Sequence, residues 1–133
     1  HDGYLGDAVI GEWCNLGAGT SCSNVKNNAS VVSVYTPTGL VAVGLKCGVL
    51  MGDYSRTAIN TSINTGTVIG VCANVFGSGL TPKHIPSFAW GSDGIQRYDF
   101  DKALAHIDNW KRLKNAALTD NETSILAHIF DHY

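Results

Sequence analysis

Residues 45–75 read LKCGVLMGDYSRTAINTSINTGTVIGVCANV, and a period of six runs through the whole stretch. Every sixth position carries an aliphatic or similar residue, namely Leu45, Met51, Thr57, Ile63, Ile69 and Val75. A small residue stands two positions before each of these residues from Met51 to Val75. Gly52 directly follows Met51, and Gly70 directly follows Ile69. The same pattern recurs around Tyr4, Ile10, Leu16 and Cys22. Neither an α-helix nor an isolated strand has a period of six, so the pattern indicates a short structural repeat.

A short fixed repeat predicts a solenoid, in which each unit buries its apolar face only by stacking on its neighbours. We expect each unit to be a short strand and a corner, with the aliphatic residue pointing inward. Glycines one position later, at Gly11, Gly17, Gly52 and Gly70, are expected to adopt the positive φ of the corner. Three units would close one triangular coil, so that Leu45 stacks on Ile63, Met51 on Ile69 and Thr57 on Val75.

These expectations divide the chain into three parts. Residues 1–80 form an all-β solenoid, a parallel β-helix of hexapeptide repeats. The count of six slips by one between Cys22 and Leu45, which predicts an excursion at residues 24–44 with two short strands around the turn Thr36–Gly39. Residues 81–98 are expected as an extended strap that caps the coil or crosses to a neighbour.

Residues 99–133 predict a C-terminal helical tail with two amphipathic helices. Asp99 suits the N-cap of the first helix, and Thr119 with Glu122 makes a capping box for the second. The apolar stripes of both helices must pack on something. We expect the tail to cover a coil end or a subunit contact.

Composition excludes several classes of partner. The chain of 133 residues has nine Lys plus Arg and a net charge of −2, too little positive charge for a nucleic-acid-binding face. No apolar run approaches a membrane span and no export signal is visible, so we expect a cytoplasmic protein with no membrane partner. The four cysteines lack zinc-site spacing, and we expect reduced structural thiols and no metal site.

The first 24 residues, HDGYLGDAVIGEWCNLGAGTSCSN, contain the elements H-x-x-Y, GDA, NLGAGT and a following Asn. In this combination they resemble the hexapeptide-repeat acyltransferases. In particular, they are similar to the C-terminal acetyltransferase domain of the bifunctional bacterial enzyme that makes UDP-N-acetylglucosamine, and to its archaeal relatives. The resemblance implies a left-handed coil, a homotrimer, acetyl-CoA as co-substrate and a sugar phosphate as acceptor.

The resemblance also assigns roles to individual residues. His1 falls on the catalytic base, and an imidazole suits proton transfer near neutral pH. Tyr4 falls near the sugar phosphate, and Asn15 and Asn24 fall on positions that hold the sugar. Ala18 falls where a backbone N–H lies by the thioester of the cofactor and stabilises the developing oxyanion.

The function that follows is acetyl-CoA-dependent N-acetylation of a hexosamine 1-phosphate. A solenoid that opens in mid-coil at its candidate base is expected to be a fragment, and the resemblance implies missing coils and an N-terminal nucleotidyltransferase domain, the only place where Mg²⁺ is expected. The alternative is a non-catalytic trimerisation or regulatory domain of a sugar-phosphate nucleotidyltransferase. A β-helix carbonic anhydrase would need three His ligands around zinc, and only His1 lies in the coils.

Overall fold

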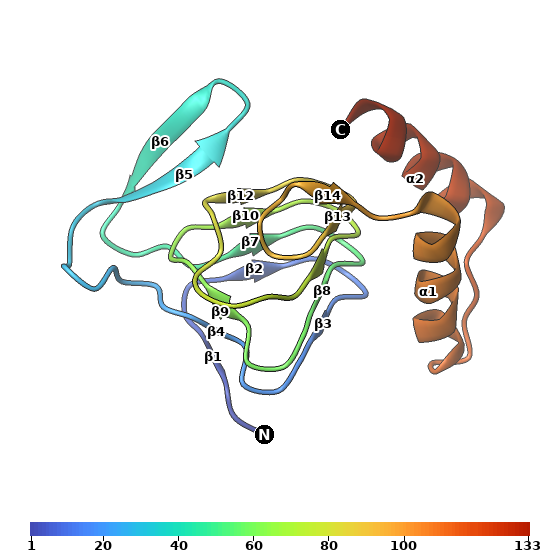
Figure 1. The fold of residues 1–133 in the computed structure, drawn as a ribbon, viewed down its shortest axis with the longest axis horizontal. Coiled ribbons are helices and arrows are strands. Elements are labelled where there is room, and N and C mark those ends of the chain that lie inside the picture. The colour runs from blue at the N-terminus through green and yellow to red at the C-terminus, as the bar shows by residue number, and fades with distance from the viewer.

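The computed structural model describes residues 1–133 without a gap. The chain winds into a coil of short strands in three parallel sheets, with a hairpin on one side and two helices on the other (Figure 1). The coil strands are β1 (Tyr4–Leu5), β2 (Val9–Ile10), β3 (Asn15–Leu16), β4 (Ser21–Cys22), β7 (Leu50–Met51), β8 (Arg56–Thr57), β9 (Ser62–Ile63), β10 (Val68–Ile69), β11 (Asn74–Val75), β12 (His84–Ile85) and β13 (Ala89–Trp90). Neither helix has the length and apolar character that a membrane crossing requires.

Strand register confirms that residues eighteen apart stack. Met51 pairs with Ile69, and Thr57 pairs with Val75. In the coil strands before β13 the second residue points inward, and those at most 5% exposed are Cys22, Met51, Thr57, Ile63, Ile69, Val75 and Ile85. Small residues two positions earlier are buried beside them, as at Val49, Ser55 and Ala73. From Ile10 onward, the aliphatic and small positions of the repeat therefore form the narrow interior of the coil. Tyr4, which the period of six had placed among them, is a correction: it pairs with the outward Ser21 and is 57% exposed, while Leu5 pairs with the inward Cys22.

The expectation that Gly11, Gly17, Gly52 and Gly70 adopt a positive φ is wrong. Positive φ falls instead three positions after the inward residue, at Trp13, Gly19, Tyr54, Asn60, Gly66 and Cys72. The four glycines lie where successive coils touch. A Cβ on Gly17 would lie 2.4 Å from the Ile59 nitrogen, and one on Gly70 would lie 2.4 Å from the Ser87 nitrogen. Glycine stands there because the neighbouring backbone leaves no room for a side chain, and not because of corner geometry.

The excursion contains the two strands expected from the sequence. Strands β5 (Val32–Thr36) and β6 (Gly39–Gly44) pair antiparallel and project from the coil (Figure 1). At the base of the excursion, the Cys47 N–H donates a hydrogen bond of 2.9 Å to the Asn24 carbonyl. This bond brings the two ends of the excursion together, so the chain leaves and rejoins the coil at nearly one place.

Leu45 is not part of the stack, which corrects the expected pair with Ile63. Ile63 pairs with Cys22 of the preceding coil instead. Leu45 is 58% exposed and lies in the segment that returns from the hairpin. The period of six reaches Leu45 by coincidence of spacing, because the coil resumes only with the next unit.

Residues 84–90, expected in an extended strap, instead form one more coil. Strand β12 pairs with β10 and β13 pairs with β11, so Ile85 stacks on Ile69. Phe88 has a φ of 57°, close to the 56° of Cys72 in the coil below. Paired residues of these two coils are sixteen positions apart in the sequence, as Ile69 and Ile85 are, and not eighteen. The corner between Leu80 and His84 is two residues shorter than the corresponding corner of the earlier coils. Strand β14 (Gln96–Arg97) then adds antiparallel to β13.

Two capped helices follow, α1 (Phe100–Arg112) and α2 (Asp120–His132). The Asp99 carboxylate accepts a hydrogen bond from the Lys102 N–H, and Thr119 with Glu122 forms the expected capping box. Both helices pack beside the coil, where a second apolar cluster consists of Cys72, Phe88, Tyr98, Ala103, Ile107 and Leu126. The corners of the coil and the inner faces of the helices share this cluster.

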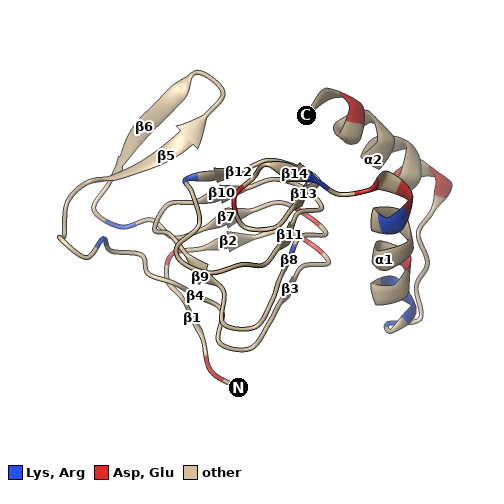
Figure 2. Cartoon of the chain, viewed as in Figure 1, with Lys and Arg blue, Asp and Glu red and all other residues tan.

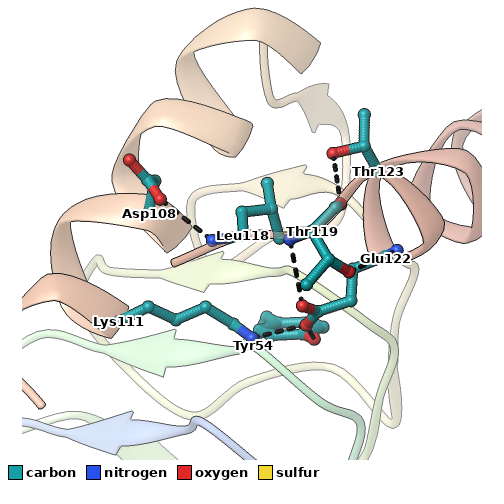
Figure 3. A network of polar contacts seen from close by, with 7 residues as sticks. All are labelled: Tyr54, Asp108, Lys111, Leu118, Thr119, Glu122 and Thr123. Atoms are coloured by element: carbon teal, nitrogen blue, oxygen red, sulfur yellow. Dashed lines mark hydrogen bonds and ion pairs between the residues drawn. The ribbon is translucent and has the colours of Figure 1, made fainter. Parts of the chain in front are cut away.

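A polar network adds to this contact (Figure 3). The Glu122 carboxylate accepts hydrogen bonds from the Tyr54 hydroxyl, at 2.6 Å, and from the Lys111 ammonium. Lys111 is only 5% exposed and also lies over the Trp13 ring, 5.0 Å from its centroid. The hydrogen bond from Lys111, followed by that from Tyr54, lowers the pKa of Glu122 to about 2. One carboxylate thus joins α2, α1 and a corner of the coil.

We predict that Thr67→Leu destabilises the fold by about 1–3 kcal/mol, because a larger side chain overpacks the interior. Thr67 is fully buried, and its hydroxyl donates a hydrogen bond of 2.6 Å to the Asn64 carbonyl. Urea denaturation measures the change, and Thr38→Leu in the exposed hairpin turn is the control. Equal stabilities of the two variants would show that Thr67 does not limit packing.

We also predict that the contribution of Glu122 to stability depends on pH. Its folded pKa of about 2 lies below the 4.5 of an ordinary Glu, so the ionised carboxylate stabilises the fold above about pH 4.5. That contribution is lost as pH falls from about 4.5 toward 2. Urea denaturation should therefore show wild type more stable than Glu122→Gln at pH 7, with the difference shrinking below pH 4.5.

Asp131→Asn, which removes an exposed carboxylate from the same helix, is the control for Glu122→Gln. Its difference from wild type should be small and should lack the same pH dependence. A Glu122→Gln difference that stays constant from pH 7 to pH 3 would contradict the assigned role of the network.

Candidate active site

The start of the chain lies along the segment that contains Ala18. The Gly19 N–H donates to the Asp2 carbonyl at 2.5 Å, and the Tyr4 N–H donates to the Thr20 carbonyl at 3.2 Å. Strand β1 then pairs with β4, with Tyr4 beside Ser21. These bonds place residues 2–5 next to residues 19–22.

An open hollow of about 640 Å³ lies between these two segments. Four of the five residues assigned by resemblance line it, namely His1, Tyr4, Asn15 and Ala18. His1 and Tyr4 are exposed, with Tyr4 at 57%. The hollow is thus a solvent-accessible surface on which an imidazole, a phenol and an amide side chain come together.

The backbone at Ala18 leaves one hydrogen-bond donor free. The Gly17 N–H donates to the Thr57 carbonyl and the Gly19 N–H donates to the Asp2 carbonyl, whereas the Ala18 N–H has no acceptor in the chain. The Gly17 carbonyl, which shares a peptide with this N–H, accepts from the Thr20 N–H at 3.1 Å, and the Ala18 carbonyl of the next peptide accepts from the Asn60 N–H at 2.8 Å, so both peptides are held in place. A fixed, unpaired N–H beside a reactive group is the kind of donor that stabilises an oxyanion.

Asn24 does not line this hollow but contacts its edge through Tyr4. The Tyr4 hydroxyl lies 3.5 Å from Asn24 Oδ1, at the limit of a hydrogen bond. The Asn24 amide donates a bond of 2.7 Å to the Asp7 carboxylate. A Cβ on Gly6 would lie 2.7 Å from the Tyr4 hydroxyl oxygen and 2.8 Å from Asn24 Cγ, so glycine leaves the space that both side chains occupy.

Asp7 is a polar residue of this site that sequence reasoning did not assign. It stood in the GDA element, but its role depends on Asn24, seventeen residues later. Its φ of 45° places it at a corner of the coil. The sequence shows only an acidic residue next to a glycine. Its partner, Asn24 of the next coil, becomes apparent only from the register in which the coils stack.

Two lysines lie close to the Asn24 side of the site. Lys26 lines a separate open hollow together with Ser23 and Asn64. The Lys83 ammonium donates a hydrogen bond to the Thr65 carbonyl, and burial, with a smaller effect of Lys26, lowers its pKa. Lys26 itself lies within the excursion. Across the whole chain, no three His, Cys, Asp or Glu side chains lie close enough together to hold a metal ion.

Comparison with known proteins bears on this arrangement. No protein-family model matches the chain. The bifunctional protein GlmU of Methanocaldococcus jannaschii is 34% identical over 87 residues, which are 65% of this chain and 21% of that protein. A bifunctional sugar-1-phosphate nucleotidylyltransferase/acetyltransferase of Sulfurisphaera tokodaii is 33% identical over 86 residues, 64% of this chain and 21% of that protein.

A third relative, named an uncharacterized acetyltransferase, YaiX, comes from Escherichia coli O6:K15:H31. It is 29% identical over 85 residues, which are 63% of this chain and 37% of that protein. The chain spans about a fifth of the length of the two archaeal relatives. Over about two thirds of its length, the chain is therefore similar to bifunctional sugar-1-phosphate nucleotidylyltransferase/acetyltransferases, and its resemblance to their acetyltransferase domain is confirmed.

Proposed function

We propose that this chain is the acetyltransferase domain of a sugar-nucleotide enzyme and transfers an acetyl group from acetyl-CoA to the amino group of a hexosamine 1-phosphate. The observation that carries the proposal is the meeting of His1, Tyr4, Asn15 and the free Ala18 N–H in one hollow. Those groups provide a base, polar contacts for a sugar and an oxyanion donor, which are the parts that acyl transfer to an amine requires. The relatives, named acetyltransferases, support the same class of reaction.

In the proposed reaction, the amine of the sugar attacks the thioester carbonyl of acetyl-CoA. His1 accepts a proton from the nitrogen, and the Ala18 N–H donates a hydrogen bond to the carbonyl oxygen as it becomes negatively charged. When the tetrahedral intermediate collapses, the carbon–sulfur bond breaks, and the coenzyme A sulfur leaves and takes up the proton held by His1. The products are the N-acetylated sugar phosphate and free coenzyme A.

Tyr4, Asn15 and Asn24 position the sugar in this proposal. The Asp7 carboxylate accepts from the Asn24 amide nitrogen, so the Asn24 carbonyl oxygen turns toward Tyr4 and the substrate. Asp7 is therefore a positioning residue rather than a catalytic one. Lys26 is the nearest candidate for a contact with the sugar phosphate, because it follows Asn24 by two residues.

The proposal includes the assembly in which such a site works. The coil is left-handed, and the chain forms a cytoplasmic homotrimer in which the groove between neighbouring coils completes each site. A nucleotidyltransferase domain with its Mg²⁺ lies outside this chain. The exposure of the hollow supports this assembly, since a second subunit would enclose it.

We predict that His1→Ala in the full-length protein lowers the rate of acetyl transfer by about 10²–10⁴-fold, the usual effect of removing a general base. The rate of N-acetylated sugar formation at saturating substrates measures it. Melting temperature and oligomeric state should stay unchanged, because His1 is exposed and contributes nothing to the apolar interior.

His128→Ala, which removes an exposed imidazole from α2, is the matched control and should retain full activity. A His1→Ala rate within a few-fold of wild type would exclude His1 as the base. Absence of acetyl transfer in wild type, with nucleotidyl transfer intact, would favour the non-catalytic trimerisation or regulatory domain.

A further inference from the structure

A second hollow, of about 340 Å³, lies between one sheet of the coil and helix α1. Alternation along a strand turns the first residue of each coil strand outward when the second points inward. In this sheet the outward residues Asn15, Arg56 and Asn74 stand in register on three successive coils. His106 and Asn109 of α1 line the opposite side. We call this hollow the Arg56 hollow.

Arg56 is a buried cation without a carboxylate partner. It is 8% exposed, and its guanidinium makes one hydrogen bond, to the Tyr98 hydroxyl, and lies 5.8 Å from the centroid of the Tyr98 ring. The same hydroxyl bonds Nδ1 of His106. Tyr98 is a neutral partner, whose pKa is raised by burial. A guanidinium carries five N–H donors, and taking a charge out of water is costly unless opposite charge or acceptors replace the solvent.

No acidic side chain lines the Arg56 hollow. The two ion pairs of the chain join Lys111 to Glu122 and Arg112 to Asp108, and neither involves Arg56. Charged residues are sparse on the coil and denser on the two helices (Figure 2). The hollow therefore combines one uncompensated positive charge with side-chain amides on both of its walls.

We propose that the Arg56 hollow binds a small oxyanion of the phosphate class. The planar guanidinium matches two oxygens of such an ion, and amide donors of Asn15, Asn74 and Asn109 are available to the others. A tetrahedral phosphate uses donors from more than one direction better than a planar carboxylate does. Asn15 lines this hollow and the candidate active site, so the two hollows adjoin.

The oxyanion has two possible sources, free phosphate or the phosphate group of a larger molecule. Both use the same contacts with Arg56. Binding to the chain can be measured without acetyl-CoA, so failure of this proposal and failure of acetyl transfer are separate results.

Thermal unfolding of the full chain tests the proposal, with sodium phosphate replacing sodium chloride at constant pH and ionic strength. A ligand that binds only the folded chain raises Tm, and at a hundredfold excess over Kd the rise should be roughly 5 °C or more. The rise should be saturable in wild type. Glycerol phosphate at the same concentrations distinguishes the two sources. If the hollow binds the phosphate group of a larger molecule, glycerol phosphate should raise Tm at lower concentration than inorganic phosphate does. If it binds free phosphate, inorganic phosphate should act at the lower concentration.

Two variants locate the effect. Arg56→Gln removes the cation, and Asn109→Asp puts a competing carboxylate at the rim of the hollow on the exposed face of α1. Both should lose the phosphate-dependent rise. Asn109→Asp keeps the test valid if Arg56→Gln does not fold, because its effect on the apolar packing should be small.

The controls change charge by the same amount elsewhere. Arg112→Gln removes an exposed cation from α1, and Asn121→Asp adds a carboxylate to α2. Both should retain the rise of wild type. No rise in wild type, or an equal rise in Arg56→Gln and Asn109→Asp, would overturn the proposal.

Discussion

Stacking of one coil on the next is the constraint on which the rest of the structure depends. Each coil strand has two residues, and no strand of this length is stable alone. Parallel pairing with the coils above and below satisfies the backbone, and the inward residues of successive coils fill one continuous interior. The coils approach so closely that Gly17 and Gly70 cannot carry a Cβ. Stability is thus a property of the stack and not of any single unit.

The candidate site follows from the same stacking. The Gly19 N–H bond to the Asp2 carbonyl and the pairing of β1 with β4 bring His1 beside Ala18. The Ala18 N–H is free, whereas the N–H groups of Gly17 and Gly19 on either side of it are bonded to neighbouring coils. Rigid coils therefore hold an imidazole and a backbone donor at one surface, with no flexible loop between them. Helices α1 and α2 stiffen the opposite side through the Glu122 network.

Much of this fold could be predicted from the sequence, because the period of six reports directly on what points inward. Helix caps at Asp99 and Thr119 and the excursion hairpin also follow from local signals. The corners could not be predicted, because non-glycine residues such as Trp13 and Cys72 adopt positive φ there while the glycines serve close packing. The last coil was missed because a corner two residues shorter breaks the count. Likewise, the pairs Asp7–Asn24 and Arg56–Tyr98 join residues that only the three-dimensional register brings together.

The central claim is that the hollow between His1 and Ala18 is a site of acetyl transfer to an amino sugar phosphate. The most direct measurement mixes the wild-type full-length protein with acetyl-CoA and follows the release of free thiol, with and without glucosamine 1-phosphate. The account predicts thiol release that requires the sugar phosphate and equals the amount of N-acetylated product. Thiol release that is absent, or that is unaffected by any hexosamine 1-phosphate while the protein remains folded, would contradict it.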